Sequence, residues 1–207
     1  MTSTAERLRT MPAVQRVPTG ALDLFVLRDF LNPSICAALI ERIDARTRPS
    51  QIADDLGDSA FRTSETCDLD HRDPLVASVD TAIANLLGIP LRQCEAIQGQ
   101  RYAVGQEFKP HTDTFEPAKA DYFTHCADTG NRSWTAMIYL NVPDAGGATR
   151  FKAIAKTIQP ETGKLLAWNN LLPDGRPNLA TLHQGMKVRR GAKYIVTKWF
   201  RERAPQA

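Results

Sequence analysis

The chain has 207 residues and a formal net charge of +3, with 43% hydrophobic and 24% charged residues. These values are those of an ordinary globular protein, and the length suits one domain with a single sizeable core. The small charge gives no basis for nucleic-acid binding, so the basic residues at 189–190 and 201–203 are expected on solvated faces. No apolar run approaches the length of a membrane span and no signal-peptide core is evident, so a cytoplasmic location is expected.

The first half of the chain reads as a scaffold. Residues 1–19 are polar and mixed, and are expected to form a loosely docked arm. Residues 22–30 alternate as in a strand. Asn32-Pro33 and Asp73-Pro74 each combine a helix N-cap with proline at the first helical position, and apolar residues follow both at helical spacing. Two helices packed on one face of a sheet are therefore predicted.

A long polar connection joins these two helices, and its likeliest strand is Phe61-Arg62-Thr63-Ser64. The chain also has four widely spaced cysteines, at 36, 67, 94 and 126. Because none of them forms a Cys-x-x-Cys pair, a structural zinc site is not expected and the cysteines are predicted to be free thiols.

From about Glu95 the sequence changes to short strands punctuated by glycine and proline turns, a pattern typical of a β-sandwich or jelly roll. The predicted strands are 96–103, 108–114, 133–142, 148–151, 157–159, 163–168, 180–184, 186–189 and 193–200. Residues 115–132 are the one long break among them. This segment is either a substrate-covering lid or a simple variable loop.

One short stretch, Lys109-Pro110-His111-Thr112-Asp113, contains a His-x-Asp pair. Side chains two positions apart on an extended chain lie on the same face, so His111 and Asp113 are expected to point together. With the distant His183 they would supply the two imidazoles and one carboxylate of a non-haem Fe(II) site, which leaves positions open for a co-substrate and O₂. Taken alone, the pair is equally compatible with a surface aspartate beside a loop histidine.

The last predicted strand, 193–200, is apolar on both faces and is expected in the middle of a sheet. Lys193 begins this strand, and a buried ammonium is costly unless it is paired. Its partner is either an internal carboxylate or an anionic ligand. A hairpin of residues 181–184 with later strands would bring Lys193 near the metal, which favours the ligand. 2-Oxoglutarate has the required groups, an oxo-acid end for Fe(II) and a distal carboxylate for Lys193.

These features occur together in a known family. From about Phe25 to Arg203 the chain resembles the prolyl 4-hydroxylase group of Fe(II)/2-oxoglutarate dioxygenases, especially its compact bacterial and algal forms. The matching stretches are 62–64, 101–113, 138–141, 146–151, 182–185 and 191–194. Each is modest alone, and their order and spacing make the resemblance specific.

The resemblance implies a mainly β fold: a double-stranded β-helix (jelly-roll) core supported by two or more N-terminal α-helices. One catalytic domain covering 1–207 is then expected, with 1–95 as support and 96–203 as the catalytic core.

Site roles follow residue by residue from the same resemblance. The implied iron ligands are His111, Asp113 and His183. The implied 2-oxoglutarate contacts are Lys193, Tyr102 and Thr149. The implied substrate contacts are Phe108, Arg132 and Trp199. Tyr102, Thr149 and Trp199 are also of types that simply pack in strands.

The implied reaction is hydroxylation of an unactivated C–H bond, most simply of a peptidyl proline, with succinate and CO₂ as co-products and ascorbate as an accessory reductant. Four departures from the family leave the substrate open. Phe108 stands where tyrosine is frequent, Ala148 replaces an acidic residue, 184–188 departs from the usual pattern, and Arg201 stands where histidine can occur.

Two alternatives therefore remain beside a peptide or protein substrate. The first is the same chemistry on a free amino acid or another small molecule. The second is a non-catalytic jelly-roll module that binds zinc through two histidines and an aspartate, against which a dicarboxylate clamp at Lys193 argues. The sequence makes no prediction of the oligomeric state.

Overall fold

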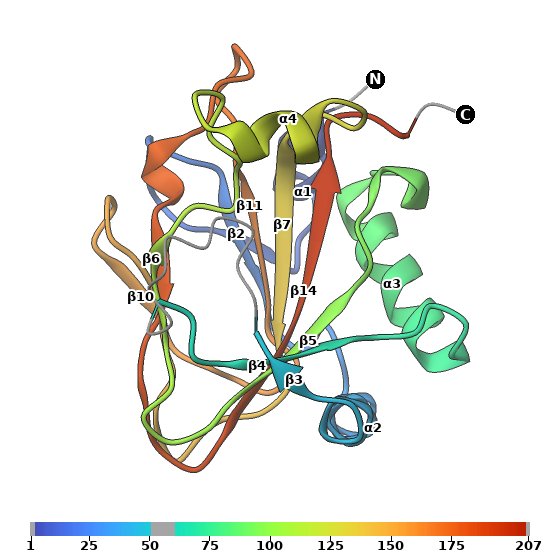
Figure 1. Cartoon of the computed structure of the whole chain (residues 1–207), viewed down its shortest axis with the longest axis vertical. Helices are drawn as coiled ribbons and strands as arrows, with labels where there is room; N and C mark the ends of the chain where they lie inside the picture. The colour runs from blue at the N-terminus through green and yellow to red at the C-terminus, as the bar shows by residue number, and fades with distance from the viewer. Residues whose placement is uncertain (1–2, 51–60, 206–207) are drawn as a thin grey trace.

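The computed structural model describes residues 3–50 and 61–205, which form two facing β-sheets with the N-terminal helices against the outer face of the larger sheet (Figure 1). The helices are α1 (Thr4–Arg9), α2 (Pro33–Asp44), α3 (Pro74–Leu87) and α4 (Ala120–Cys126), with 3₁₀ turns η1 (Leu91–Gln93) and η2 (Leu179–Thr181). The strands are β1 (Val14–Arg16), β2 (Leu24–Leu27), β3 (Arg48–Pro49), β4 (Glu65–Asp68), β5 (Gln98–Tyr102), β6 (Phe108–His111), β7 (Arg132–Tyr139), β8 (Ala145–Gly146), β9 (Thr149–Phe151), β10 (Lys156–Ile158), β11 (Leu165–Asn169), β12 (His183–Gly185), β13 (Val188–Arg190) and β14 (Lys193–Arg201).

The larger sheet has the strand order β1-β2-β11-β7-β14-β5-β4-β3, and the smaller sheet has the order β10-β9-β12-β6. Neighbouring strands within each sheet run antiparallel, and β8 and β13 form a separate short pair. A jelly roll of facing antiparallel sheets with supporting helices is the fold class that the sequence predicts. Two separate apolar clusters lie on the two faces of the larger sheet, one toward the helices and one toward the smaller sheet.

Both predicted scaffold helices are present. The Asn32 side chain accepts a hydrogen bond from the backbone N–H of Ile35, and Asp73 caps α3 in the same way, with proline at the first turn of each helix. Gly88 ends α3 with φ of 71°, a left-handed conformation that glycine adopts without the steric cost of a Cβ. Within the described residues no helix is both long and apolar enough to cross a membrane.

Strand β14 is the centre of the larger sheet, between β7 and β5. Its alternate residues pack on opposite sides, so Val196 and Phe200 join the cluster under the helices while Lys193 and Trp199 line a cavity between the sheets. The predicted central position of this strand is confirmed, and its two buried faces explain why its sequence is apolar throughout.

The prediction of a loosely docked arm at residues 1–19 is wrong. Ser3 and Glu6 form a capping box that begins α1, and β1 pairs with β2. Leu8 is 1% exposed in the core, and the Thr4 hydroxyl donates to the Leu87 carbonyl at the end of α3. One buried leucine holds this short helix, and a single apolar residue gives no periodic signal.

The strand predicted at 61–64 lies slightly too early. In that stretch only Arg62 forms an isolated bridge, with Phe108, and β4 begins at Glu65, which pairs with Arg101 of β5. The neighbouring strand therefore decides which residues of the polar connection become extended.

The segment 115–132 is not a structureless break, because it contains α4 and β7 already begins at Arg132. Lys119 provides no side-chain cap, which explains why the sequence gives no helix signal there. The Arg201 guanidinium donates to the His125 and Gly130 carbonyls at 3.1 and 2.9 Å, so α4 is tied to the end of β14 (Figure 1). The lid remains a prediction. All four cysteines are free thiols, as expected.

Candidate active site

Three predicted ligand residues meet between the sheets. β6 and β12 run antiparallel with His111 opposite His183, and Asp113 follows two residues after the end of β6. Their ligand atoms all lie within 4.8 Å of one another. The Nε2 atoms of His111 and His183 are each 3.9 Å from the Asp113 carboxylate, through Oδ1 and Oδ2 respectively. Two imidazoles and one carboxylate facing a common point are a donor set that fits Fe(II) with open positions.

Backbone carbonyls orient both imidazoles. His111 Nδ1 lies 2.8 Å from the Lys109 carbonyl oxygen, and His183 Nδ1 lies 2.9 Å from that of Thr181. A carbonyl only accepts, so each Nδ1 donates and each Nε2 presents its lone pair toward the other ligands. Burial, followed by the proximity of His183, lowers the pKa of His111 to about 3, which keeps this imidazole neutral and able to bind a cation.

A hydroxyl and an amide orient the carboxylate. Thr135 Oγ1 donates to Asp113 Oδ2 at 2.7 Å, and Asn170 Nδ2 donates to Thr135 Oγ1 at 2.8 Å. Burial by itself would raise the pKa of Asp113, but the two imidazoles, Arg132 and the Thr135 hydroxyl together lower it. The carboxylate is therefore held ionised and aimed at the two histidines.

Lys193 lies in the same cavity with only 1% of its surface exposed. Its Nζ has no carboxylate partner among the described residues, and it lies over the neutral ring faces of Tyr102 and Tyr139, with ring centroids at 5.0 and 5.4 Å. Burial lowers the pKa of Lys193 to about 7. An internal carboxylate, one of the two partners predicted for this lysine, is thus not found, and the unpaired buried amine fits an anionic ligand.

The route by which Lys193 reaches the site differs from the predicted hairpin. β12 belongs to the smaller sheet and pairs with β6 and β9, whereas Lys193 begins β14 of the larger sheet. The lysine instead reaches across the gap between the sheets. Its Nζ lies 3.8 Å from the point that a Cβ would occupy if Gly185 on β12 had a side chain.

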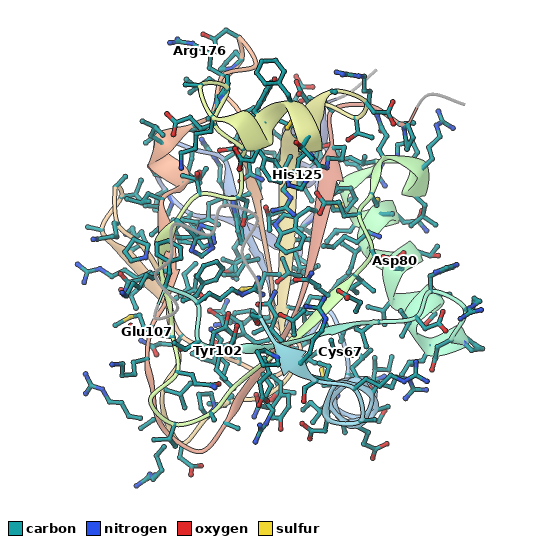
Figure 2. The ribbon with its side chains drawn as sticks, in the orientation of Figure 1. Cys67, Asp80, Tyr102, Glu107, His125 and Arg176 are labelled. Carbon is teal, nitrogen blue, oxygen red and sulfur yellow. The ribbon has the colours of Figure 1, made fainter. Side chains whose placement is uncertain are left out.

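The two hydroxyl residues predicted beside Lys193 also line the cavity. Tyr102, in the interior in Figure 2, donates from its hydroxyl to Gln100 Oε1 at 3.1 Å. Thr149 Oγ1 accepts from the Tyr139 hydroxyl at 2.6 Å. Thr149 can therefore donate its own proton to a ligand, and Tyr139 fixes its orientation.

Phe108 and Trp199 line the cavity on either side of the triad. The Phe108 ring stacks on His111 with centroids 3.5 Å apart and an interplanar angle of 16°. The Arg62 guanidinium lies 4.9 Å from the centroid of the same Phe108 ring. Phe108 thus supplies packing to a metal-ligand candidate and no hydroxyl.

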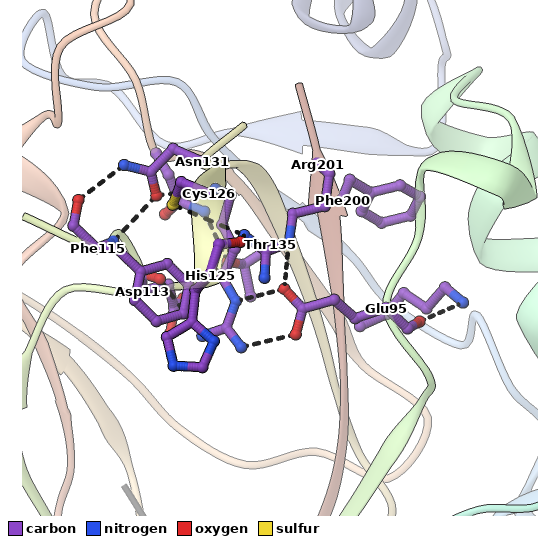
Figure 3. Close-up of polar contacts among 12 residues, drawn as sticks. Glu95, Asp113, Phe115, His125, Cys126, Asn131, Thr135, Phe200 and Arg201 are labelled. Atoms are coloured by element: carbon purple, nitrogen blue, oxygen red, sulfur yellow. Dashed lines mark hydrogen bonds and ion pairs between the residues drawn. The ribbon is translucent and has the colours of Figure 1, made fainter. Parts of the chain in front are cut away.

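Arg132, the third predicted substrate contact, is not one of the cavity-lining residues. Its Nε and Nη2 pair with the two Glu95 oxygens, each at 2.7 Å, and its guanidinium lies 3.9 Å from the Trp199 ring centroid. Arg201 Nε also contacts Glu95, at 2.7 Å, so one carboxylate is shared by two guanidinium groups (Figure 3). Arg132 is held beside Trp199 and Asp113 rather than free in the cavity.

Sequence reasoning missed several residues of this site. Thr135 and Tyr139 lie on the same face of β7, where Thr135 lines the cavity and Tyr139 packs in the cluster between the sheets, and a period-two reading of that strand could have assigned them. Glu95 and Asn170 follow no motif. Each reaches its partner only through tertiary folding, so no local signal could have found them.

Comparison with known proteins places the chain in a family. Residues 97–201 match the family model of the 2OG-Fe(II) oxygenase superfamily. The chain belongs to this superfamily. The superfamily is named for 2-oxoglutarate and Fe(II), and the three ligand residues form a donor set that fits Fe(II).

Curated relatives of this oxygenase include prolyl 4-hydroxylase subunits. It is 32% identical over 147 residues to subunit alpha-1 of Gallus gallus, covering 70% of the chain and 28% of the relative. Its identity to subunit alpha-1 of Homo sapiens is 28% over 185 residues, covering 89% of the chain and 33% of the relative. The chain thus spans about a third or less of the length of these relatives.

Solved structures share the fold. The viral collagen prolyl hydroxylase of Paramecium Bursaria Chlorella virus-1, in its 2OG complex, has a TM-score of 0.68 at 23% identity, covering 86% of this chain and 94% of that one. A Pseudomonas putida prolyl-4-hydroxylase has a TM-score of 0.60 at 20% identity, covering 87% and 92%. A Trichoplax adhaerens prolyl hydroxylase, solved with a hypoxia inducible factor peptide, has a TM-score of 0.65 at 14% identity, covering 96% and 87%.

Proposed function

We propose that this oxygenase hydroxylates an unactivated C–H bond, with peptidyl proline as the first candidate substrate. The observation that supports it is the coexistence, in one cavity, of the His111–Asp113–His183 cluster and the unpaired buried Lys193. A metal-binding module needs the first feature, and a dicarboxylate co-substrate accounts for the second. The relatives and solved structures described above are prolyl hydroxylases, which supports the peptidyl substrate.

In this proposal each side chain has a defined task. His111, Asp113 and His183 bind Fe(II), held in place by the Lys109 and Thr181 carbonyls and by the Thr135 hydroxyl. Lys193, Tyr102 and Thr149, which line the same cavity, bind the distal carboxylate of 2-oxoglutarate. When bound, Fe(II) and 2-oxoglutarate supply the O₂-dependent hydroxylation chemistry, with succinate and CO₂ as co-products.

The apolar walls of the cavity have a separate role. Met137, Trp168 and Ile195 line it and are at most 5% exposed, so they exclude bulk water from the reacting groups. Low water content strengthens the electrostatic interactions of Lys193 and Asp113 with bound charges.

Phe108 favours a second candidate, a free amino acid or other small molecule as the hydroxylated substrate. Its ring lies flat on His111 at the substrate side of the triad, where it offers no hydrogen bond to a peptide group. Phe108, Trp199 and the nearby Arg132 are proposed to contact either substrate.

Succinate release from 2-oxoglutarate, measured over a panel of proline-containing peptides and free amino acids, tests both candidates. We expect turnover to require Fe(II) and to fall to the background in Asp113→Ala, while Asp144→Ala, a change at an exposed surface carboxylate, leaves it unaffected. Mass spectrometry that finds one added oxygen on a peptide proline supports the first candidate. Modification of a free amino acid alone supports the second, and unchanged turnover in Asp113→Ala contradicts the iron site.

Two further properties belong to the same proposal. Ascorbate is proposed as a reductant that sustains turnover, so its omission should shorten the linear phase of succinate release. A cytoplasmic location is proposed from the composition of the chain and its free cysteines, and fractionation of cells that express the protein would test it.

A further inference from the structure

Two tryptophans beside the metal-ligand cluster, Trp168 and Trp199, have buried indole N–H groups that find no hydrogen-bond partner among residues 3–50 and 61–205. Both line the cavity between the sheets, and Trp168 is only 1% exposed. A buried tryptophan usually finds an acceptor for its N–H, because leaving the donor unpaired away from water is costly. An unpaired donor at a ligand cavity therefore indicates an acceptor on the ligand.

Strand register fixes where Trp168 lies relative to the triad. Thr135 of β7 is the direct partner of Trp168 on β11 and of Trp199 on β14, so the three residues form one row across the larger sheet. The Thr135 hydroxyl binds Asp113, and the Trp168 ring meets His183 nearly edge-on, with centroids 4.9 Å apart and an interplanar angle of 66°. Trp168 thus borders the triad on the side of Asp113 and His183.

Ring packing gives the N–H no nitrogen or oxygen acceptor among the described residues. The contacts of Trp168 with His183 and Phe151 explain why a large aromatic side chain occupies this place. A phenylalanine would satisfy both contacts without burying a donor. The indole nitrogen is the feature that packing leaves unexplained.

We propose that Trp168 Nε1–H donates a hydrogen bond to the carboxylate oxygen of 2-oxoglutarate at its oxo-acid end. Lys193 lies several residues along β14 from Trp199, which shares a row with Trp168. The amine of Lys193 and the indole N–H of Trp168 are therefore placed to bind opposite ends of the co-substrate. Trp168 is then a binding residue for the end next to the metal, and Lys193 for the distal end. This assignment depends on 2-oxoglutarate use and is independent of which substrate is hydroxylated.

The unmodified protein provides the first test. The chain has three tryptophans, so ¹⁵N-indole labelling gives three N–H signals, assigned with single phenylalanine variants. Zn(II)-loaded protein is titrated with oxalate, which offers a carboxylate at the metal and has no distal group for Lys193. We expect the Trp168 signal to move downfield and the Trp134 signal, on the opposite face of β7, to stay in place. An unmoved Trp168 signal contradicts the proposal.

Affinities of the Zn(II)-loaded variants provide the second test. Trp168→Phe should lower the affinity for oxalate and the affinity for 2-oxoglutarate by the same factor, about tenfold for the loss of a hydrogen bond to a charged acceptor. Lys193→Met should lower the affinity for 2-oxoglutarate and leave the affinity for oxalate unchanged. Trp134→Phe should leave both affinities unchanged. Equal affinities in Trp168→Phe and the parent protein overturn the assignment. If Trp168→Phe does not bind metal, the oxalate titration of the Trp168 indole signal in the parent protein tests the proposal by itself.

Discussion

Two kinds of buried charge give individual residues of this oxygenase their roles. The Asp113 carboxylate is surrounded by donors and cations, and these lower its pKa despite burial. The Lys193 amine lies over aromatic faces with no carboxylate within reach in the part of the chain that the structure describes, and burial lowers its pKa to about 7. The Asp113 carboxylate is therefore suited to bind a cation, and the Lys193 amine to bind an anion.

The amine of Lys193 should make 2-oxoglutarate binding depend on pH. Only the protonated amine attracts a carboxylate, and the ligand-free protein loses this proton as pH rises through about 7. Affinity is therefore expected to be full below that pH and to fall by up to about tenfold per pH unit above it. Calorimetric titrations in several buffers, which also report proton uptake on binding, would measure this.

Lys193→Met provides the control for this pH dependence. The variant should bind 2-oxoglutarate weakly with little change over the same range, since its side chain has no proton to lose. A flat profile in the parent protein would contradict the role of Lys193.

Thr135 should control metal affinity through Asp113. Thr135→Val removes the hydroxyl that donates to Asp113 and leaves Asn170 Nδ2 without its acceptor. We expect metal affinity to fall about tenfold to a hundredfold, the usual effect of losing a contact that orients a metal ligand. Competition with a chelator measures it. Thr135→Ser keeps the hydroxyl and should retain most of the affinity, and equal losses in both variants would point to packing instead.

Among the elements, α1 has a larger part in stability than its length indicates. It is six residues long, yet Leu8 is buried in the main core and Arg7 donates to the Asn85 and Leu86 carbonyls at the end of α3. Arg7 thus supplies donors to two carbonyls in the last turn of α3, which have no partner within that helix.

Leu8→Ala is therefore expected to lower the free energy of unfolding by about 2–5 kcal/mol, the range for large-to-small changes at fully buried positions. Urea unfolding followed by circular dichroism measures this. Leu179→Ala makes the same chemical change at a residue that is 74% exposed and should cost less than about 0.5 kcal/mol. A small effect at Leu8 would mean that α1 is detached in solution.

For the whole molecule, we propose that the support (1–95) and the catalytic core (96–203) form one cooperative domain. β2 of the support pairs with β11 of the core, and β4 pairs with β5, so both parts share the larger sheet. The buried Lys198 of β14 forms an ion pair with Asp80 of α3 and donates to the Glu95 carbonyl, which joins the sheet to a support helix.

Because the support and the core share the larger sheet, we expect a single unfolding transition. Far-ultraviolet circular dichroism reports the helices, and tryptophan fluorescence reports β7, β11 and β14, so the two curves should coincide. The Leu8→Ala variant should shift both midpoints together. Separate midpoints in either protein would show that the support and the core unfold independently.

Local signals in the sequence determined much of this protein. Short strands punctuated by turn residues predicted a β-sandwich or jelly roll, and the Asn32-Pro33 and Asp73-Pro74 starts placed α2 and α3 correctly. The buried position of Lys193 was also predictable, because it depends on the apolar pattern of one strand. The meeting of His111 and Asp113 was predictable from their spacing of two, although β6 ends at His111 and Asp113 lies just beyond the strand. Such features are set by residues that are neighbours in the chain.

Tertiary structure alone decided the rest. α1 depends on one leucine reaching the core, β4 begins where β5 offers a partner, and Lys193 reaches the site across two sheets instead of through a hairpin. The donors and acceptors that orient Asp113 come from β7 and from beyond the end of β11. Contacts between residues distant in the chain exist only once the sheets have formed, so their energies leave no pattern in a single sequence.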